Sequence, residues 1–206
     1  MENEFKFYFL WLSLICIIVF VLQQIPDFTD LFILNSKTIV DFQIWRFLTA
    51  IFLHSSIVHL SYNLFALLFF GGLLEKTIGS KNFLVLFICS GIIANMISVN
   101  FYSSSLGASG AIYGILGVLI ILKPTMVVWA FGLIMPMFVA GILWIIGGII
   151  GIFIPGNTGH IAHLSGIGIG ILVGLVLITK KSPKEKIILE IPEKYFRIWE
   201  EKNIKN

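Results

Sequence analysis

The chain has 206 residues and a formal net charge of +3, and 58% of its residues are hydrophobic while only 12% are charged. A soluble globular domain carries about 25% charged residues, so this composition excludes an ordinary soluble protein and predicts an integral membrane protein. The length allows several membrane spans and one small tail, but not a second large domain. Cys16 and Cys89 both lie in apolar stretches, so neither a disulfide nor thiol chemistry is expected.

Six apolar stretches predict six transmembrane helices, so the expected fold is all-α and polytopic. They are expected at about residues 5–22, 57–74, 83–101, 109–122, 135–152 and 161–178. The first is interpreted as a retained helix rather than a signal peptide, because the segment before it is not basic and no small-residue cleavage site follows it. Residues 1–179 would form the membrane domain, and the polar residues 180–206 would form a cytoplasmic tail.

Two connections contain apolar pieces of their own. The long connection between the first two helices, residues 23–56, carries Trp45 and Arg46 and should place amphipathic pieces at the membrane interface. Residues 127–133 are expected to form a short interfacial segment before the fifth helix, because a glycine and a proline interrupt the apolar run there.

The distribution of positive charge predicts the orientation. With six spans both termini lie on the same side of the membrane, and twelve of the fourteen Lys and Arg residues fall on that side. Only Lys37 and Arg46 lie in the segments on the other side. Because cytoplasmic segments carry the excess of Lys and Arg, both termini are expected to be cytoplasmic, in a multi-pass protein of the plasma membrane.

Four polar residues within the predicted helices lie at a similar depth. Ser109, His163, His59 and Asn63 are 13 to 17 residues from the basic residue at the cytoplasmic end of their own helix. At 1.5 Å per residue these separations are about 20 to 25 Å, in the outer part of a hydrocarbon core about 30 Å thick. Buried polar groups in a membrane cost free energy unless they have partners, so this cluster indicates a functional site.

The fourth predicted helix, which begins at Ser109, is too short to reach the outer surface. The chain before it must therefore descend into the membrane as irregular backbone. Such backbone is tolerated only inside protein or along a water-filled cavity. The sequence thus predicts a cavity that opens to the outside, with Ser109 at its floor.

Ser109 and His163 are candidates for a nucleophile and its base. The alternatives are a plain N-cap hydroxyl for the serine and ordinary core packing for the histidine. Small faces on the two helices favour a close approach between them; their glycines are Gly110, Gly114 and Gly117 on the fourth helix and Gly166, Gly170 and Gly174 on the sixth. No Asp or Glu lies at this depth, so the two residues would act as a Ser–His dyad.

Three further side chains could complete such a site. Tyr113 lies one turn from the serine on the same helix face and could orient the ring of His163, with simple core packing as the alternative. His59 and Asn63 are spaced i, i+4, so both could donate hydrogen bonds to a developing oxyanion.

A zinc site is the rival interpretation of the histidines. Such a site would use His54, His59, His160 and His163 together with Asn63. Zinc usually takes three or four ligands from His, Cys and carboxylate, and this depth has no Cys or carboxylate. We therefore expect no metal, and we expect neither a cofactor nor nucleic acid as a partner.

Five motifs in chain order resemble those of the rhomboid family of intramembrane serine proteases. They are W-R at 45–46, H-L-S-Y-N at 59–63, G-L-L-E-K-T-I-G at 72–79, G-A-S-G-A-I-Y-G at 107–114 and A-H-L-S-G-I-G-I-G at 162–170. Each motif alone is weakly specific, but five of them in order on the expected helices are highly specific. The resemblance covers about residues 41–174 and is weakest around the fifth helix.

The resemblance implies a role for each matching residue. Ser109 would be the nucleophile and His163 the general base, while His59, Asn63 and the backbone N–H of Ser109 would line an oxyanion hole. Gly107 would lie at the entrance of the fourth helix. Residues expected to support the site are Gly107, Gly110, Tyr113, Gly166 and Gly170, and residues expected to have structural roles are Trp45, Arg46 and Glu75.

The sequence therefore predicts a six-helix protease whose substrates are transmembrane proteins in the lipid bilayer. Two other functions remain open. A small transporter or channel fits the composition, although its polar residues would be expected along a path rather than at one depth. A non-catalytic relative that binds client helices fits the motifs, although the intact serine and histidine argue against it.

Overall fold

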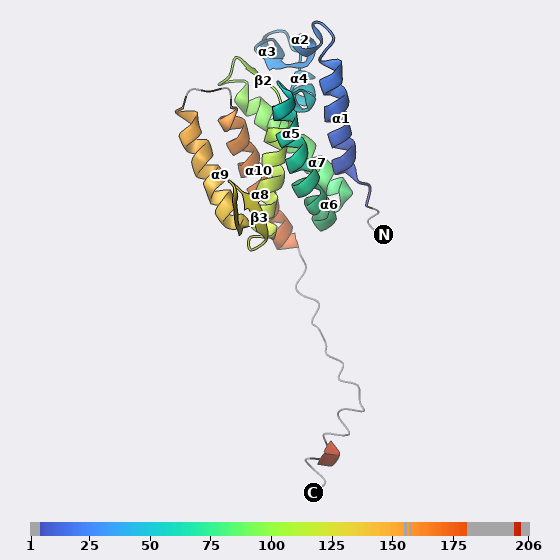
Figure 1. The fold of residues 1–206 in the computed structure, drawn as a ribbon, viewed down its shortest axis with the longest axis vertical. Coiled ribbons are helices and arrows are strands. Elements are labelled where there is room, and N and C mark those ends of the chain that lie inside the picture. Colours follow the sequence, from blue (N-terminus) through green and yellow to red (C-terminus); the bar gives the residue numbers. More distant parts are fainter. Residues whose placement is uncertain (1–4, 155, 157, 181–199, 203–206) are drawn as a thin grey trace.

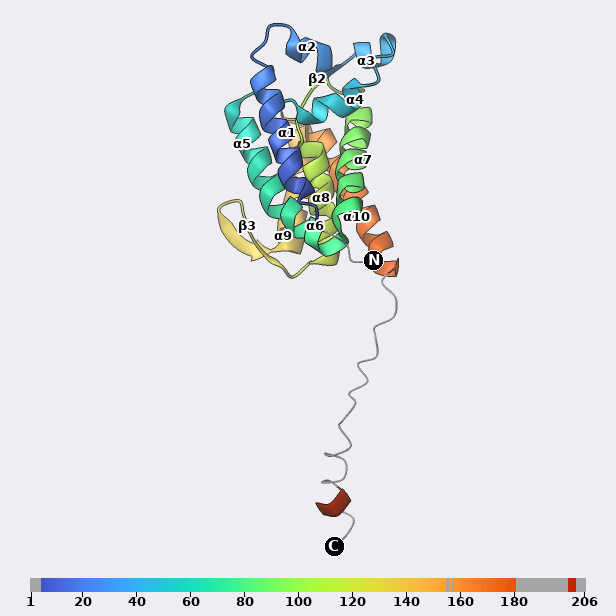
Figure 2. The ribbon, with the colours of Figure 1, turned by 90° about the vertical axis from the view of Figure 1, so that its right-hand side faces the viewer.

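A computed structural model describes residues 5–154, 156, 158–180 and 200–202. It shows a bundle of helices in which α8 (Ser109–Leu122) occupies the centre, packed against α7 and α10 (Figures 1 and 2). The helices around it are α1 (Tyr8–Leu22), α5 (Ile57–Ala66), its continuations η2 (Leu67–Gly71) and α6 (Gly72–Ile78), α7 (Ser80–Ser98), α9 (Met137–Ile152) and α10 (His160–Lys180). The bundle agrees with the expected all-α fold. The expected tail at 180–206 lies almost entirely outside the described residues.

Within the described residues, three helices are long and apolar enough to cross a membrane by length and composition. They are the continuous helix Ile57–Ile78, Ser80–Ser98 and His160–Thr179. The apolar helices α1, α8 and α9 are shorter, and the 14 residues of α8 rise only about 21 Å. The multi-helix membrane architecture thus follows from the helices themselves, while the count of six spans stays a prediction.

The second and third helices begin or end several residues away from the expected positions. The sequence predicts an end of the second helix at residue 74, but α6 continues to Ile78 because the charged Glu75 is fully buried within the protein. The third helix is predicted at 83–101 and observed at Ser80–Ser98. Gly79, with φ of +83°, separates these two helices and allows the third to begin earlier.

The carboxylate of Glu75 joins the start of the first helix to the end of the second. It accepts hydrogen bonds from the backbone N–H groups of Tyr8 and Phe9, each at 3.0 Å, and from the hydroxyl of Ser80 at 2.6 Å. The N–H groups of a first helical turn have no partner within the helix, and a negative charge there is favourable. The buried charge is thereby compensated, and α1 is fixed to the bundle.

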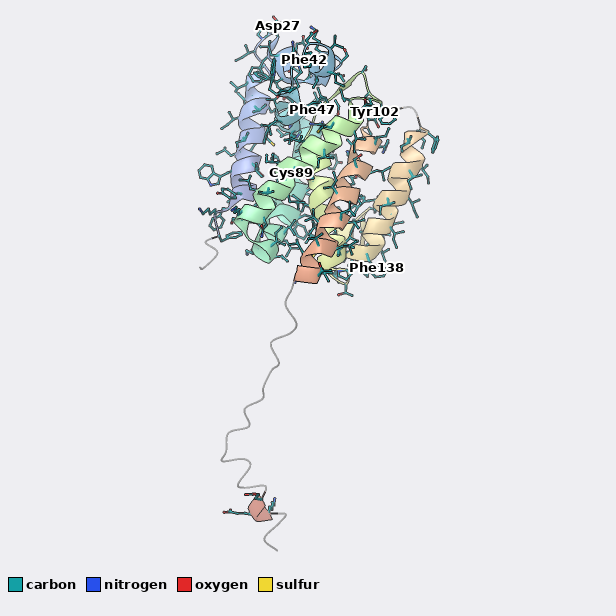
Figure 3. The ribbon with its side chains drawn as sticks, turned by 180° about the vertical axis from the view of Figure 1, so that it is seen from behind. Asp27, Phe42, Phe47, Cys89, Tyr102 and Phe138 are labelled. Atoms are coloured by element: carbon teal, nitrogen blue, oxygen red, sulfur yellow. The ribbon has the colours of Figure 1, made fainter. Side chains whose placement is uncertain are left out.

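The connection between the first two long helices folds into short helices at one end of the bundle. They are α2 (Phe28–Phe32), α3 (Lys37–Val40), α4 (Arg46–Thr49) and η1 (Ala50–Phe52). A two-residue strand, β1 (Leu34–Asn35), pairs antiparallel with β2 (Ser104–Ser105). Figure 3 shows the labelled Asp27 and Phe42 of this loop at the end of the bundle opposite Phe138.

Arg46 and Trp45 hold this loop together. The buried guanidinium of Arg46 donates hydrogen bonds to the carbonyl oxygens of Asp30 at 2.7 Å and Ile33 at 2.6 Å, and to the side chain of Gln43 at 2.6 Å. The indole N–H of the exposed Trp45 donates to the carbonyl of Leu31 at 3.3 Å.

Residues 127–133, expected to form a short interfacial segment, are part of a β-hairpin. Strand β3 (Val127–Ala130) pairs antiparallel with β4 (Leu133–Pro136). The two turn residues, Phe131 and Gly132, have φ of +54° and +79°, the positive values that a two-residue type I′ turn requires. The hairpin takes up the residues before Met137, so α9 begins two residues later than expected.

The central helix α8 meets α10 backbone to backbone. A Cβ atom added to Gly166 or Gly170 of α10 would collide with the carbonyl oxygen of Gly110 or Gly114 of α8. Small residues at a helix interface allow this separation, which larger side chains would prevent.

The glycines of α8 are divided between two neighbours, which corrects the single face expected from sequence. A Cβ on Gly110 would lie 2.8 Å from the Cβ of Ala94 on α7. A Cβ on Gly114 would collide with Ser90, which also belongs to α7. Only Gly117 has its open side against α10. Helix α8 therefore fits tightly between α7 and α10.

Candidate active site

The polar residues that the sequence places at one depth all line a single cavity of about 1520 Å³. Its walls come from α5, α8, α10, the segment 101–107 and the β3–β4 hairpin. The predicted site residues among its lining are His59, Asn63, Gly107, Ser109, Gly110, Tyr113 and His163. Segments far apart in sequence thus bring together the side chains that a reaction would need.

Ser109 and His163 are in hydrogen-bond contact, with 2.8 Å between the serine Oγ and the histidine Nε2. Ser109 is the first residue of α8, and Ala108 occupies the N-cap position, so the hydroxyl is not an N-cap. His163 lies in the first turn of α10. The glycine contacts between these helices fix the separation of the two side chains. In a neutral ring whose Nε2 is unprotonated, the hydroxyl donates to that nitrogen.

Tyr113 covers one face of the His163 ring. The two rings are stacked, with centroids 4.2 Å apart and planes 14° from parallel. His160 meets the same ring edge-on, with centroids 6.2 Å apart. His160 itself fills the space beside Gly151 of α9, where a Cβ would collide with its ring. Neighbours on two sides therefore restrict the orientation of the imidazole.

Gly107 lets the chain pass closely beside His59. Its φ is +123°, a value that L side chains rarely adopt, and its N–H donates to the carbonyl of Ala50 at 2.8 Å. A Cβ at Gly107 would lie 2.9 Å from Nε2 of His59 and 3.9 Å from Oγ of Ser109. The imidazole of His59 thus lies against the backbone just before the serine.

Asn63 is buried one turn further along α5. Its amide nitrogen donates to the carbonyl oxygen of His59 at 3.0 Å. An amide NH₂ group carries two hydrogens, so one remains for a group in the cavity. The side chain of Asn63 is thereby held by the backbone of His59, a contact that the i, i+4 spacing alone does not show.

Two residues near the site, Tyr102 and Ser55, were not assigned a site role from sequence. The Tyr102 hydroxyl accepts a hydrogen bond from the backbone N–H of Ile161 at 3.1 Å, at the start of α10. Ser55 contacts the ring of His59 through its hydroxyl at 3.1 Å. Its spacing of four residues from that histidine was the available signal. His54, a ligand in the rival zinc interpretation, is buried with its ring in a T-shaped arrangement against the ring of His59.

His54 lies in the connection before α5 and is held in its neutral form. Burial, and secondarily the neighbouring His59, lower its pKa from the ordinary 6.5 to about 4. Its Nδ1 lies 3.2 Å from the carbonyl oxygen of Phe52. Across the described part of the chain, no three His, Cys, Asp or Glu residues are grouped so that they could hold a metal ion.

A family model described as the Rhomboid domain matches residues 41–180, which is more than half of the chain. The chain belongs to the rhomboid family. This finding confirms the resemblance seen in the five motifs, and it identifies an integral membrane protein with a polytopic helical fold. The matched region includes every residue that lines the cavity except Ile33 of the first loop.

Several rhomboid relatives carry protease names. The rhomboid protease GlpG of Haemophilus influenzae is 27% identical over 170 residues, covering 80% of this chain and 88% of that protein. The rhomboid-like protease 3 of Toxoplasma gondii is 33% identical over 118 residues, covering 52% of this chain and 45% of that protein. The rhomboid protease GluP of Bacillus subtilis is 45% identical over 78 residues, covering 37% of this chain and 15% of that protein. The chain thus spans less than half the length of the last two relatives.

Proposed function

We propose that this rhomboid is an intramembrane serine endopeptidase in which Ser109 is the nucleophile and His163 the general base. The observation that carries the proposal is the 2.8 Å contact between Oγ and Nε2 inside a large cavity. A serine hydroxyl is a weak nucleophile unless an adjacent base accepts its proton. The protease names of the relatives support the same reaction class.

The reaction would proceed through an acyl-enzyme. Oγ of Ser109 attacks the carbonyl carbon of the scissile peptide bond while its proton passes to Nε2 of His163. The negative oxygen of the tetrahedral intermediate accepts hydrogen bonds from the backbone N–H of Ser109 and from the side chains of His59 and Asn63. The C–N bond then breaks, and His163 gives its proton to the leaving amine.

Hydrolysis completes the cycle. A water molecule in the cavity loses a proton to His163 and attacks the ester carbonyl on Ser109. Collapse of the second tetrahedral intermediate releases the new carboxyl group, and His163 returns the proton to Oγ. With no acid as a third member, the stacked ring of Tyr113 would hold the imidazole in the orientation that both steps need.

The substrate would be a transmembrane or juxtamembrane segment of another membrane protein. A helical substrate hides its peptide groups in i→i−4 hydrogen bonds, so it has to unwind locally before the serine can attack. Substrates with Gly or Pro close to the scissile bond are therefore expected. The six-span topology, the plasma-membrane location and a cavity open to the outside belong to this proposal. The distribution of Lys and Arg supports its cytoplasmic termini.

Labelling with a fluorescent alkyl fluorophosphonate tests the proposal, because the probe modifies only an activated serine. The full chain in detergent should be labelled, and Ser109→Ala and His163→Ala should not be. Failure of the folded wild type to label would overturn the proposal. Solute transport without labelling would favour a transporter, and capture of client helices without labelling would favour a binding protein.

A further inference from the structure

Two neighbouring serines hold His59 at different points. The hydroxyl oxygen of Ser55 lies 3.1 Å from Nδ1 of the ring, and the backbone nitrogen of Ser55 lies 3.5 Å from the same atom. The hydroxyl of Ser56 accepts a hydrogen bond at 3.1 Å from the backbone N–H of His59 and so caps α5. Ser55 thus contacts the ring, whereas Ser56 contacts only the backbone.

The Ser55 contact selects one tautomer of the ring. A backbone N–H can only donate, so the Nδ1 that faces it has to present its lone pair. The Ser55 hydroxyl, which can donate or accept, then also donates to Nδ1. In a neutral imidazole the remaining proton is on Nε2, because the hydrogen bond at one ring nitrogen decides which nitrogen is protonated.

The protonated nitrogen lies beside Gly107, two residues before the nucleophile. Nε2 of His59 lies on the side of the ring next to Gly107, whose missing Cβ would be 2.9 Å from Nε2 and 3.9 Å from Oγ of Ser109. A carbonyl under attack by Oγ would develop its charge in this region. His54 packs its ring edge-on against His59, with centroids 5.1 Å apart, so the ring is also restricted on that side.

We propose that Ser55 is a positioning residue that holds His59 in the tautomer with the proton on Nε2, so that the ring donates a hydrogen bond toward Ser109. The catalytic consequence rests on the proposed function, but the tautomer does not. Ser55 acts through His59 and does not itself touch the reacting atoms.

Nitrogen NMR of ¹⁵N-histidine-labelled protein tests the tautomer directly, since protonated and unprotonated ring nitrogens have well-separated chemical shifts. The His59 signals are assigned by their loss in His59→Gln. In the wild type, Nε2 of His59 should be protonated and Nδ1 unprotonated. In Ser55→Ala, which loses the hydroxyl but keeps the backbone N–H, this preference should weaken, while Ser55→Thr, which keeps the hydroxyl, and Ser56→Ala should both retain it. A wild-type ring with its proton on Nδ1 would overturn the proposal, whatever the variants do.

The rate of fluorophosphonate labelling supplies the functional readout. Ser55→Ala should lower the maximal labelling rate about fivefold, as expected for loss of one neutral hydrogen bond, with the probe concentration for half-maximal rate unchanged. Ser55→Thr should remain within about twofold of the wild type. Ser56→Ala should lower thermal stability but not the rate, because the cap affects the helix rather than the ring.

If wild type shows the Nε2–H tautomer but no labelling, only the proposed function fails. A Ser55→Ala protein with unchanged tautomer and unchanged rate contradicts the positioning role.

Discussion

The contact between α8 and α10 differs in kind from the hairpin that connects α8 to α9. In the first, backbone meets backbone, and a Cβ on Gly166 or Gly170 would collide with a carbonyl oxygen of α8. In the second, side chains such as Trp129 and Ile134 are 64% and 77% exposed, and the turn residue Gly132 has open space around it. We infer from this contrast that the Ser109–His163 distance depends on the glycines between α8 and α10 rather than on the hairpin. Substitutions in these two regions should therefore have very different effects.

The largest effect is expected for Gly170→Val, which places side-chain atoms where the carbonyl of Gly114 lies. Overpacking of this kind costs about 1–3 kcal/mol or more. Displacement of α10 by about 1 Å should lower the labelling rate about 100-fold. Thermal unfolding in detergent and the fluorophosphonate labelling rate measure the two effects.

Gly168→Ala is the matched control on the same helix, because no atom lies within 4 Å of its added Cβ. It should leave both the unfolding temperature and the labelling rate near those of the wild type. If Gly168→Ala and Gly170→Val lose labelling rate equally, the loss comes from altered flexibility of α10 rather than from a disturbed backbone contact with α8.

A smaller but still large loss of labelling rate is expected for Gly107→Ala. Both Gly107 and Gly132 have positive φ, so alanine at either position strains the backbone by about 1–3 kcal/mol. Only at Gly107 would the methyl group also press on the ring of His59. Because displacing an oxyanion donor can cost about 100-fold, Gly107→Ala should reduce the labelling rate strongly, while Gly132→Ala should reduce only the unfolding temperature. Similar rates for the two variants would contradict the placement of His59 at the site.

Tyr113→Ala should produce a moderate loss of labelling rate. The stacked ring orients His163, and aromatic pairs contribute about 0.5–1.5 kcal/mol, so the labelling rate should fall about two- to tenfold. Tyr113→Phe keeps the ring and should label at nearly the wild-type rate. If the phenylalanine variant loses as much as the alanine variant, the hydroxyl rather than the stacked ring is the important group.

The smallest effect is expected in the hairpin. Ile134→Ala removes a side chain that is 77% exposed and does not line the cavity. Such surface changes usually alter the free energy of unfolding by less than about 0.5 kcal/mol, and the labelling rate should be unchanged. A tenfold loss of rate would mean that the hairpin positions the site after all.

The same contrast explains which features the sequence predicts. The boundaries of α8 were predicted correctly, because Gly107 lies two residues before Ser109 and Lys123-Pro124 follows Leu122. The hairpin was missed because its turn begins with Phe131 at positive φ, where Asn, Asp or Gly would be the recognisable signal. The second helix was predicted too short because Glu75 reads as a helix-ending surface charge, and its backbone partners on α1 are distant in sequence.

The sequence indicated which polar residues gather around the cavity but not the contacts between them. Depth along the helices and glycine spacing indicated that Ser109 and His163 approach one another, and the structure gives their distance. The helix against which each glycine packs could not be predicted, because it depends on how the helices are arranged around one another. The contact of Ser55 with His59 depends on the path of the chain before α5, which hydrophobic periodicity does not specify.

The most direct test of the central claim is cleavage of a membrane-embedded substrate by the purified full chain in liposomes. The substrate is a single-span model protein with a glycine near the outer end of its helix, and mass spectrometry of the products locates the cut. We expect one cut within or beside the span by the wild type and none by Ser109→Ala. Absence of cleavage by labelled, folded wild type, or equal cleavage by Ser109→Ala, would contradict it.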